Sequence, residues 1–422
     1  MAIGSLDRSG IWESPILRVW RHRNFALFMS GIGPHYVTGW MQRIGVGWLA
    51  WELTHSPIWL GAVAAADLAP MILIAPFAGA HVDRSDPVRM IKLTLFAVWC
   101  HAIALAALTT AGMMSIELLF AITLVNGSLM PFYNAARTTI VPACVPREDF
   151  PSGVSLDSSF FHGSRFVGPM IAALVIKYFG IGYCFMAHVA GVAFFIFQIF
   201  RMNVTPPRRA APTSNLVQDV VAGLAYVRAH PGIFPLFMLM TTASIAARPL
   251  QDFLPGFADK VFQSGASGFA WLSAGMGVGA MIGATWIAIR GHTRGLTYIV
   301  ILSTFALGLS MFGFVATSNL YGACVFAAMC GFALTVMATG ISALTQTAVN
   351  DAMRGRVMSL FAMIYRGVPA IGALATGYAA SIVGLRTAFA MAAFGCILVW
   401  LGMANAPRRI DAAMNVREQG KG

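Results

Sequence analysis

The chain alternates between long blocks of apolar residues and short polar breaks. The blocks reach the roughly 20 residues that a helix needs to cross the hydrocarbon core of a bilayer, and they lack the strand-like alternation of an outer-membrane barrel. Window length and helix breakers predict twelve spans. These cover residues 25–52, 58–80, 90–111, 116–137, 153–178, 183–203, 233–255, 267–289, 296–316, 319–345, 357–382 and 385–404. The pattern predicts an all-α polytopic membrane protein.

The breaks between spans differ in charge. Residues 54–57 and 112–115 carry no Lys or Arg, whereas residues 83–89 are basic, and this alternation continues along the chain. Most of the 28 Lys and Arg residues fall on one side, which includes Arg137 and Arg147, and the opposite side holds Lys177, Lys260 and Arg386. The positive-inside rule therefore predicts cytoplasmic N and C termini.

The longest polar break, residues 203–232, divides the spans six plus six. Within it, Leu216, Val220, Leu224 and Val227 have helical spacing, which predicts an amphipathic helix. We expect an N-terminal half at 1–203, a cytoplasmic linker at 204–232, a C-terminal half at 233–404 and a cytoplasmic tail at 405–422. Residues 79–84 resemble 283–290, and 168–169 resemble 369–372. Two pseudo-symmetric six-helix halves are typical of alternating-access transporters.

Composition excludes several classes of protein. Of the 422 residues, 58% are hydrophobic and only 10% charged, too few charges for a water-soluble domain. The net charge of +12 comes from basic residues between spans, so no nucleic-acid partner is expected. No Walker loop, G-x-S-x-G or H-E-x-x-H motif occurs, so we expect neither an enzyme nor ATP as the energy source. The Cys and His residues lack metal-ligand spacing, and we expect no metal or cofactor.

Two ionisable residues inside the first spans stand at similar depth. Arg43 lies about nine residues before the end of span one, and Asp67 about nine residues after the start of span two. We expect an ion pair, because a charge inside a bilayer is usually paired or faces water. One interpretation is a structural pair that pins the helices. The other is that Asp67 binds a proton coupled to substrate movement.

Further charged and aromatic residues predict a central cavity. Arg165 and Arg366 lie in the inner halves of spans five and eleven, and with Arg248 they outnumber the acids Asp67 and Asp157, which favours anionic or phenolate-bearing substrates. The alternative for Arg165 is bonding to carbonyls freed by Pro169. Asp157 and Asp252 are expected to be solvated caps near span ends. The predicted cavity residues are His35, Tyr36, Trp40, Tyr133, Asn134, Phe161, Arg165, Arg248, Tyr365 and Arg366.

The segment Gly79-Ala80-His81-Val82-Asp83-Arg84 resembles the loop motif G-x-x-x-D-R of the major facilitator superfamily, although the usual Gly and adjacent bases are absent after Arg84. Six further segments resemble the enterobactin-exporter-like, or transmembrane secretion effector, branch. They are residues 40–43, 53–57, 145–150, 165–169, 254–258 and 354–360. The resemblance covers almost the whole chain and implies the major facilitator fold.

The resemblance also implies a function and a set of moving parts. It implies a multi-pass exporter of small molecules in a bacterial inner membrane, driven by a proton or other ion gradient and working as a monomer. A cytoplasmic gate is expected between Gly79, Asp83 and Arg84 on one side and Arg354 and Arg356 on the other. Residues 164–173 approximate the antiporter motif of span five, which makes Gly168 and Pro169 a hinge. The superfamily's arginine on span four is missing from 119–134.

Two alternatives remain open from the sequence. A lipid or lysophospholipid flippase of the same fold would take its substrate sideways between spans. A membrane scaffold or sensor without transport would need a docking domain, and the tail at 405–422 is short. The leading hypothesis is export of a small amphipathic or anionic organic molecule, such as a siderophore, drug or metabolite.

Overall fold

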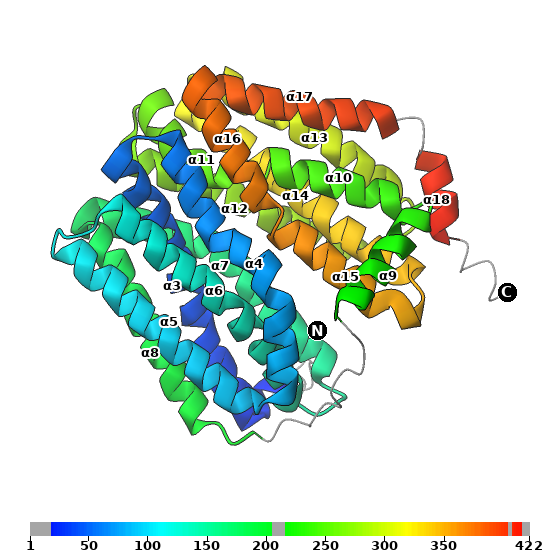
Figure 1. Ribbon diagram of the computed structural model, residues 1–422, viewed down its shortest axis with the longest axis horizontal. Helices are drawn as coiled ribbons and strands as arrows, with labels where there is room; N and C mark the ends of the chain where they lie inside the picture. The colour runs from blue at the N-terminus through cyan, green and yellow to red at the C-terminus, as the bar shows by residue number, and fades with distance from the viewer. Residues whose placement is uncertain (1–17, 205–215, 404–406, 416–422) are drawn as a thin grey trace, which may run out of the picture.

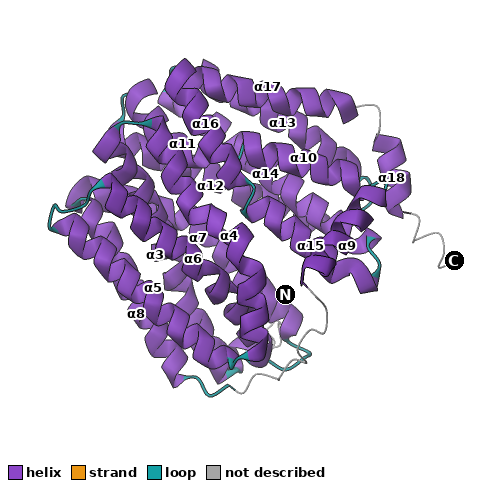
Figure 2. Cartoon of the chain, in the orientation of Figure 1, coloured by secondary structure: helices purple, strands orange, loops and turns teal. Residues whose placement is uncertain are grey.

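The computed structural model describes residues 18–204, 216–403 and 407–415. Within these ranges the chain consists of helices joined by short loops, with no strand (Figure 2). The predicted all-α fold is therefore confirmed. Residues 205–215, which include most of the polar stretch of the predicted linker, and the distal tail lie outside the described part of the chain.

The first half is built from six long helices (Figure 1). They are α3 (Arg23–Thr54), α4 (Pro57–Arg84), α5 (Pro87–Thr110), α6 (Ile116–Ile140), α7 (Phe150–Phe179) and α8 (Ile181–Arg201). Short 3-10 turns, η1 (Val19–Arg21) and η2 (Val141–Ala143), precede α3 and α7. Proline in the first turn begins α4, α5 and α7, where its missing N–H costs no hydrogen bond.

The second half repeats this arrangement with interrupted helices. Its elements are α10 (Ile233–Ala246), α11 (Leu250–Gly256), η3 (Phe257–Val261), α12 (Gly265–Arg290), α13 (Leu296–Ala316), α14 (Leu320–Ala348), α15 (Asp351–Arg366), α16 (Pro369–Val383) and α17 (Leu385–Met403). The predicted span 233–255 is interrupted before Leu250 and continues to Val261, and the predicted span 357–382 begins earlier and is interrupted at Gly367. Pro249 and Pro369 lie at these breaks. Proline has no backbone N–H to donate to the preceding helical turn, so the helix loses a hydrogen bond there.

Within the described residues, eleven helical segments are long and apolar enough to cross a membrane. Helix α3 is not among them, although it has 32 residues and packs against α7 and α8 within the first half. Polar residues such as His35, Gln42 and Arg43 lower its hydropathy, and all three line the interior cavity described below. Helix α3 thus has the length and position of the first predicted span, 25–52, and its polar residues His35, Gln42 and Arg43 face the protein interior rather than lipid.

The chain has two distinct ends along the helix axes. One end carries α9 (Leu216–Ala229) and α18 (Pro407–Asn415), and we call it the linker end. The opposite end carries the loops at residues 55–56, 111–115 and 317–319, and we call it the far end. The helix predicted within the linker is confirmed as α9. In Figure 1 the two halves lie side by side at the far end and separate toward the linker end.

Two helix pairs join the halves, α4 with α16 and α7 with α12. Gly61 on α4 packs against the backbone of Ala373 on α16, and Gly277 on α12 packs against the backbone of Arg165 on α7. A methyl group on either glycine would overlap the facing backbone, so the absence of a side chain permits this close approach. At the far end, Trp51 Nε1 donates to Asp259 Oδ2 at 2.9 Å and Lys260 Nζ donates to the His55 carbonyl at 3.0 Å. Both bonds hold the far end closed.

Candidate functional site

A cavity of about 360 Å³ lies between the halves, with walls from α3 to α8 on one side and from α11, α12, α15 and Arg248 on the other. All ten residues that the sequence predicted for the cavity line it, namely His35, Tyr36, Trp40, Tyr133, Asn134, Phe161, Arg165, Arg248, Tyr365 and Arg366. Arg43, Asp67 and Asp252 line it as well. The structure therefore brings residues from both halves to one place, and their contact with a substrate remains a prediction.

The predicted pair of Arg43 and Asp67 forms, with Arg43 Nη1 2.7 Å from Asp67 Oδ2. The same guanidinium also donates through Nη2 to Asp252 Oδ1 at 2.8 Å, which crosses from the first half to the second. Asn126 Nδ2 lies 3.3 Å from the other Asp67 oxygen. Arg43 is therefore shared between two carboxylates, whereas the sequence suggested one.

Asp252 does not occupy the solvated cap position that the sequence suggested. Its side chain is 14% exposed and faces Arg43, because the break before Leu250 starts a new short helix and places Asp252 in its first turn, beside the cavity. The Arg248-Pro249 dipeptide is the sequence signal for this break, since proline disfavours helix at the residue before it. A continuous span would have aimed Asp252 elsewhere.

Asp157 and Arg137 form a second buried pair that the sequence analysis missed. Arg137 Nη1 lies 2.7 Å from Asp157 Oδ2, and Tyr36 donates from its hydroxyl to Asp157 Oδ1 at 2.9 Å. The two charged side chains are 15% and 13% exposed. The sequence placed Arg137 outside the spans, but α6 continues to Ile140 and carries it into the bundle. The helical i, i+4 spacing from the cavity residue Tyr133 to Arg137 was the available signal.

Three cavity arginines have no ion-pair partner among the described residues: Arg165, Arg248 and Arg366. Aromatic rings stand beside two of them. The Arg165 guanidinium carbon is 5.3 Å from the Trp40 ring centre, and that of Arg248 is 4.4 Å from the Tyr365 ring centre. Cation–π contact offsets part of the cost of burying these charges, and the Tyr365 hydroxyl also interacts with both Arg165 and Arg248.

The expected gate is only partly described. The side chain of Asp83 lies outside the described residues, and Arg84 and Arg354 are exposed at the linker end. Arg356 Nε lies 2.7 Å from Asp219 Oδ1 on α9, so this arginine bonds to the linker helix in the present state. The pairing of Asp83 with Arg356 therefore stays a prediction for the opposite state.

The expected hinge lies within a continuous helix. Helix α7 runs through Gly168 and Pro169 without a break, and both residues are buried. Gly168 packs against the Trp40 side chain and the Val37 carbonyl on α3. Its smallness thus permits contact between α3 and α7, and movement at this point stays a prediction.

A carboxylate at the linker end ties the chain start to the first half. His22 Nε2 lies 2.8 Å from Asp149 Oδ2, and Arg18 Nε donates to Asp149 Oδ1 at 2.7 Å. Hydrogen bonds from His22 and from Arg18 lower the pKa of Asp149 below its usual value. The turn before α3 is thereby fastened to the loop that precedes α7.

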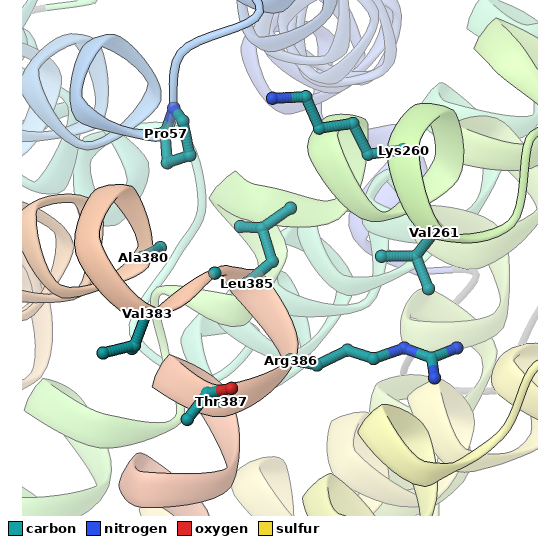
Figure 3. Close-up of a pocket in the computed structure, with 9 residues that line it drawn as sticks. Pro57, Lys260, Val261, Ala380, Val383, Leu385, Arg386 and Thr387 are labelled. Atoms are coloured by element: carbon teal, nitrogen blue, oxygen red, sulfur yellow. The ribbon is translucent and has the colours of Figure 1, made fainter.

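A second hollow of about 260 Å³ lies at the far end where the halves meet (Figure 3). Pro57 contributes from the first half, and Lys260, Leu385 and Arg386 contribute from the second. Arg386 Nη2 donates to the Thr317 carbonyl at 3.0 Å, and Lys260 bonds to the His55 carbonyl, so both cations hold loops. The hollow is thus part of the far-end closure.

The arrangement of two helical halves around a charged cavity defines a transporter of the major facilitator type. A solved POT family transporter in complex with thioalcohol-conjugated peptide has the same fold, with a TM-score of 0.75 at 11% identity over 92% of this chain and 96% of that one. The transmembrane secretion effector family matches residues 20–419, and the chain belongs to it. The sequence resemblance is thereby confirmed, and the protein is a membrane transporter and not an enzyme.

Two curated relatives share this architecture along nearly their whole length. The staphyloferrin A transporter of Staphylococcus aureus is 22% identical over 375 residues, which is 86% of this chain and 91% of the relative. Macrolide efflux protein A of Streptococcus pyogenes is 21% identical over 415 residues, which is 96% of this chain and all of the relative. The names of these two relatives refer to transport of staphyloferrin A and to efflux of macrolides.

Proposed function

We propose that this protein exports a small amphipathic organic anion across the bacterial inner membrane by alternating access. The observation that carries the proposal is the set of three cavity arginines without a carboxylate partner among the described residues, Arg165, Arg248 and Arg366. Arg43 faces two carboxylates, and Arg137 faces one, so those charges are compensated. The cavity therefore retains positive charge that an anion would neutralise.

The aromatic walls support an amphipathic substrate rather than an inorganic ion. Trp40, Tyr36 and Phe161 line the cavity together with aliphatic side chains such as Leu68 and Met71. Apolar walls with a few fixed charges are typical of sites for small organic molecules, because the walls bind the body of the ligand and the charges fix its orientation. This matches a siderophore, drug or metabolite that carries a carboxylate or phenolate.

The closed end and the basic side support export as the direction of transport. Contacts between Trp51 and Asp259 and between Lys260 and His55 hold the far end shut, so substrate enters from the linker end. The linker end carries most of the basic residues outside spans, and the positive-inside rule assigns that end to the cytoplasm. Entry from the cytoplasm corresponds to export, as in the efflux protein named above.

Energy coupling is assigned to the Arg43 site. Protonation of Asp252 would weaken the Arg43–Asp252 pair, which crosses the interface between halves, whereas protonation of Asp67 would release Arg43 from its partner within the first half. In this proposal one of these two events lets the far end open. Anion export against a gradient requires such a link between an ion and the interface. The coupling ion we propose is the proton.

The test compares cells that lack the gene with cells that overproduce the protein. Loss should raise the intracellular level of one anionic compound, and that compound should enter inverted membrane vesicles only when they contain the protein. Arg165→Gln, Arg248→Gln and Arg366→Gln should each reduce uptake at least about tenfold, the cost of about 1.4 kcal/mol of binding. Arg201→Gln, at the exposed end of α8 and outside the cavity, is the matched control. Accumulation of a phospholipid instead would favour the flippase alternative, and a neutral or cationic substrate would contradict the proposal.

A further inference from the structure

The first-half wall of the cavity holds five polar atoms that are buried and have no hydrogen-bond partner among the described residues. They are His35 Nδ1, Gln42 Oε1, His101 Nδ1, Thr123 Oγ1 and the Tyr133 hydroxyl. Each of these side chains is more than nine-tenths buried. We call these five residues the neutral recess. The sequence listed His35 and Tyr133 as cavity residues but gave no reason to group them with the other three.

The recess is held in place by packed rings. The His35 ring stacks on the His188 ring at 5.5 Å between centres and meets the Tyr133 ring edge-on at 5.5 Å. His188 Nδ1 lies 3.3 Å from Thr38 Oγ1, so that histidine already has a partner. Helices α3, α5, α6 and α8 each contribute one of these residues or a residue of the recess. These contacts restrain the rings of His35 and Tyr133.

An unpaired buried polar atom costs about 1–3 kcal/mol, and folded proteins pair nearly all such atoms. Five of them on one cavity wall therefore indicate a place that is completed by something other than the chain. Water that enters from the linker end would supply partners between transport cycles. A substrate that displaces this water must replace its hydrogen bonds, or it loses affinity.

The chemistry of the recess indicates neutral ligand groups. The Tyr133 and Thr123 hydroxyls donate or accept, Gln42 Oε1 accepts, and each free imidazole nitrogen takes the role its tautomer allows. The nearby Arg137 is neutralised by Asp157. The described residues contain no group of His, Cys, Asp or Glu side chains arranged to hold a metal ion. Hydroxyl, carbonyl or amide groups fit this set.

We propose that the neutral recess binds hydroxyl, carbonyl or amide groups at one end of the substrate, while Arg165, Arg248 and Arg366 bind its anionic end. The substrate class is therefore an organic anion with a neutral, hydrogen-bonding part, and not a simple fatty or aromatic acid. This inference rests on the proposed function, because it assigns the second end of the same transported molecule. It adds a specificity that the arginines alone cannot provide, because they bind any anion of suitable size.

Three fluorescent coumarin probes separate the two ends. All three probes share the coumarin carbonyl. To it the glucuronide of 4-methylumbelliferone adds a carboxylate and hydroxyls, the glucoside adds hydroxyls without a carboxylate, and the carboxymethyl ether adds a carboxylate without hydroxyls. Uptake of each is measured in energised inverted vesicles with and without the protein. The wild type should transport the glucuronide at least about tenfold faster than the carboxymethyl ether, because several recess hydrogen bonds are lost with the latter.

Two variants remove single hydroxyls while they preserve packing. Tyr133→Phe and Thr123→Val should each lower the ratio of glucuronide to carboxymethyl-ether transport about three- to tenfold, the value of one hydrogen bond. Thr123→Ser restores the hydroxyl and should restore the ratio. The matched control is Thr94→Val, which removes a buried hydroxyl that already bonds to the Met90 carbonyl on the same helix. Thermal stability in detergent shows whether each variant is folded.

The outcomes separate this inference from the proposed function. Three outcomes would overturn the neutral recess as a substrate site. They are equal wild-type transport rates for the glucuronide and the carboxymethyl ether, no glucuronide transport, and an equal fall of both rates in the recess variants. Arg248→Gln tests the anionic end, because it should lower the transport rates of the glucuronide and the carboxymethyl ether relative to the rate of the glucoside. If Arg248→Gln changes no ratio while Tyr133→Phe still does, the anion proposal fails and the recess stands.

Discussion

At the residue scale, each buried charge in this bundle is explained by its immediate neighbours. Arg43 lies between Asp67 and Asp252 at 2.7 and 2.8 Å, and Arg137 lies 2.7 Å from Asp157. Within a membrane an unpaired charge is costly, so these pairs hold helices together. Of the other cavity arginines, Arg165 and Arg248 contact aromatic rings, and neither they nor Arg366 has an ion-pair partner among the described residues. Arginines thus have two different roles in this bundle: Arg43 and Arg137 pair with carboxylates, and the other three have no ion-pair partner among the described residues.

A first prediction concerns Asp67. Asp67→Asn keeps a hydrogen-bond acceptor for Arg43 but cannot bind and release a proton, so pH-driven transport should fall at least about tenfold while folding is retained. Vesicle uptake driven by an imposed pH gradient measures this. The matched control is Asp86→Asn, an exposed carboxylate that caps α5 by accepting from the Val88 N–H and lies outside the cavity. Full pH-driven transport by Asp67→Asn would eliminate it as the coupling carboxylate, and Asp252→Asn would then be tested in the same way.

A second prediction concerns the pair of Arg137 and Asp157. Removal of one partner from a buried pair leaves an uncompensated charge, so Asp157→Leu should lower the free energy of unfolding by about 3–5 kcal/mol. The double variant Arg137→Met/Asp157→Leu removes both charges and should recover most of the loss. Thermal unfolding of the purified variants tests this. A double variant as unstable as the single one would show that the pair's charges are not the cause.

At the element scale, the breaks in helices decide where charges point. Helices α10 and α11 are separated near Pro249, and α15 and α16 near Gly367, and both breaks lie beside the cavity that contains Arg248 and Arg366. Helix α9 lies on α15, where Gly223 is close to Leu360 and the Arg356 backbone, and Asp219 bonds Arg356. The linker helix is therefore fastened to the second half rather than free between the halves.

A third prediction belongs to the start of α10. Gly232 and Ile233 donate their backbone N–H groups to His230 Nδ1, both at 3.2 Å, which caps the helix. Burial lowers the pKa of His230 below 6.5, so the stability from the neutral ring is fully present above that pH and is lost as pH falls through the folded-state pKa. Hydrogen exchange at the start of α10 should accelerate on acidification.

The control for this prediction is His230→Asn, which offers an acceptor that does not titrate in this range. Its hydrogen exchange at Gly232 and Ile233 should be nearly independent of pH after correction for the intrinsic exchange rate. An unchanged pH dependence in His230→Asn would assign the acid sensitivity to another group.

At the scale of the whole molecule, the two halves meet through backbones along α4 with α16 and along α7 with α12, and they enclose a cavity between them. Gly61 against Ala373 and Gly277 against Arg165 give contact without intervening side chains. Such flat helix surfaces can slide or rock with little repacking, which suits alternating access. The charges of Arg43 and Asp252 cross the same interface, so a change at either one acts on the contact between halves.

A fourth prediction tests orientation. A cysteine at Ser56, in the far-end loop, should react with a membrane-impermeant maleimide in intact cells, whereas one at Ala229, at the exposed end of α9, should react only after permeabilisation. The wild-type chain, whose six cysteines are free, measures the background. The reverse labelling pattern would invert the topology and turn the proposed export into import.

The sequence by itself determined the fold class, the approximate positions of the spans and the list of cavity residues. Span length, turn residues and the side preference of charges are local properties, and they are independent of how helices pack. The sequence also predicted the pair of Arg43 and Asp67, because the two residues lie at similar depth in adjacent antiparallel spans. It also predicted a helix at the position of α3, because the first apolar block is long enough for a span although polar residues interrupt it.

Only the tertiary structure decided which charges meet across the chain. Asp252 reaches Arg43 over 209 positions in sequence because a helix break re-aims it, and Arg137 meets Asp157 because α6 runs further than its apolar block. The grouping of His35, His101 and Thr123 likewise comes from three different helices. Helix periodicity fixes a residue's angle on its own helix, but the rotation of one helix against another depends on packing, and that choice selects which polar atoms share the cavity.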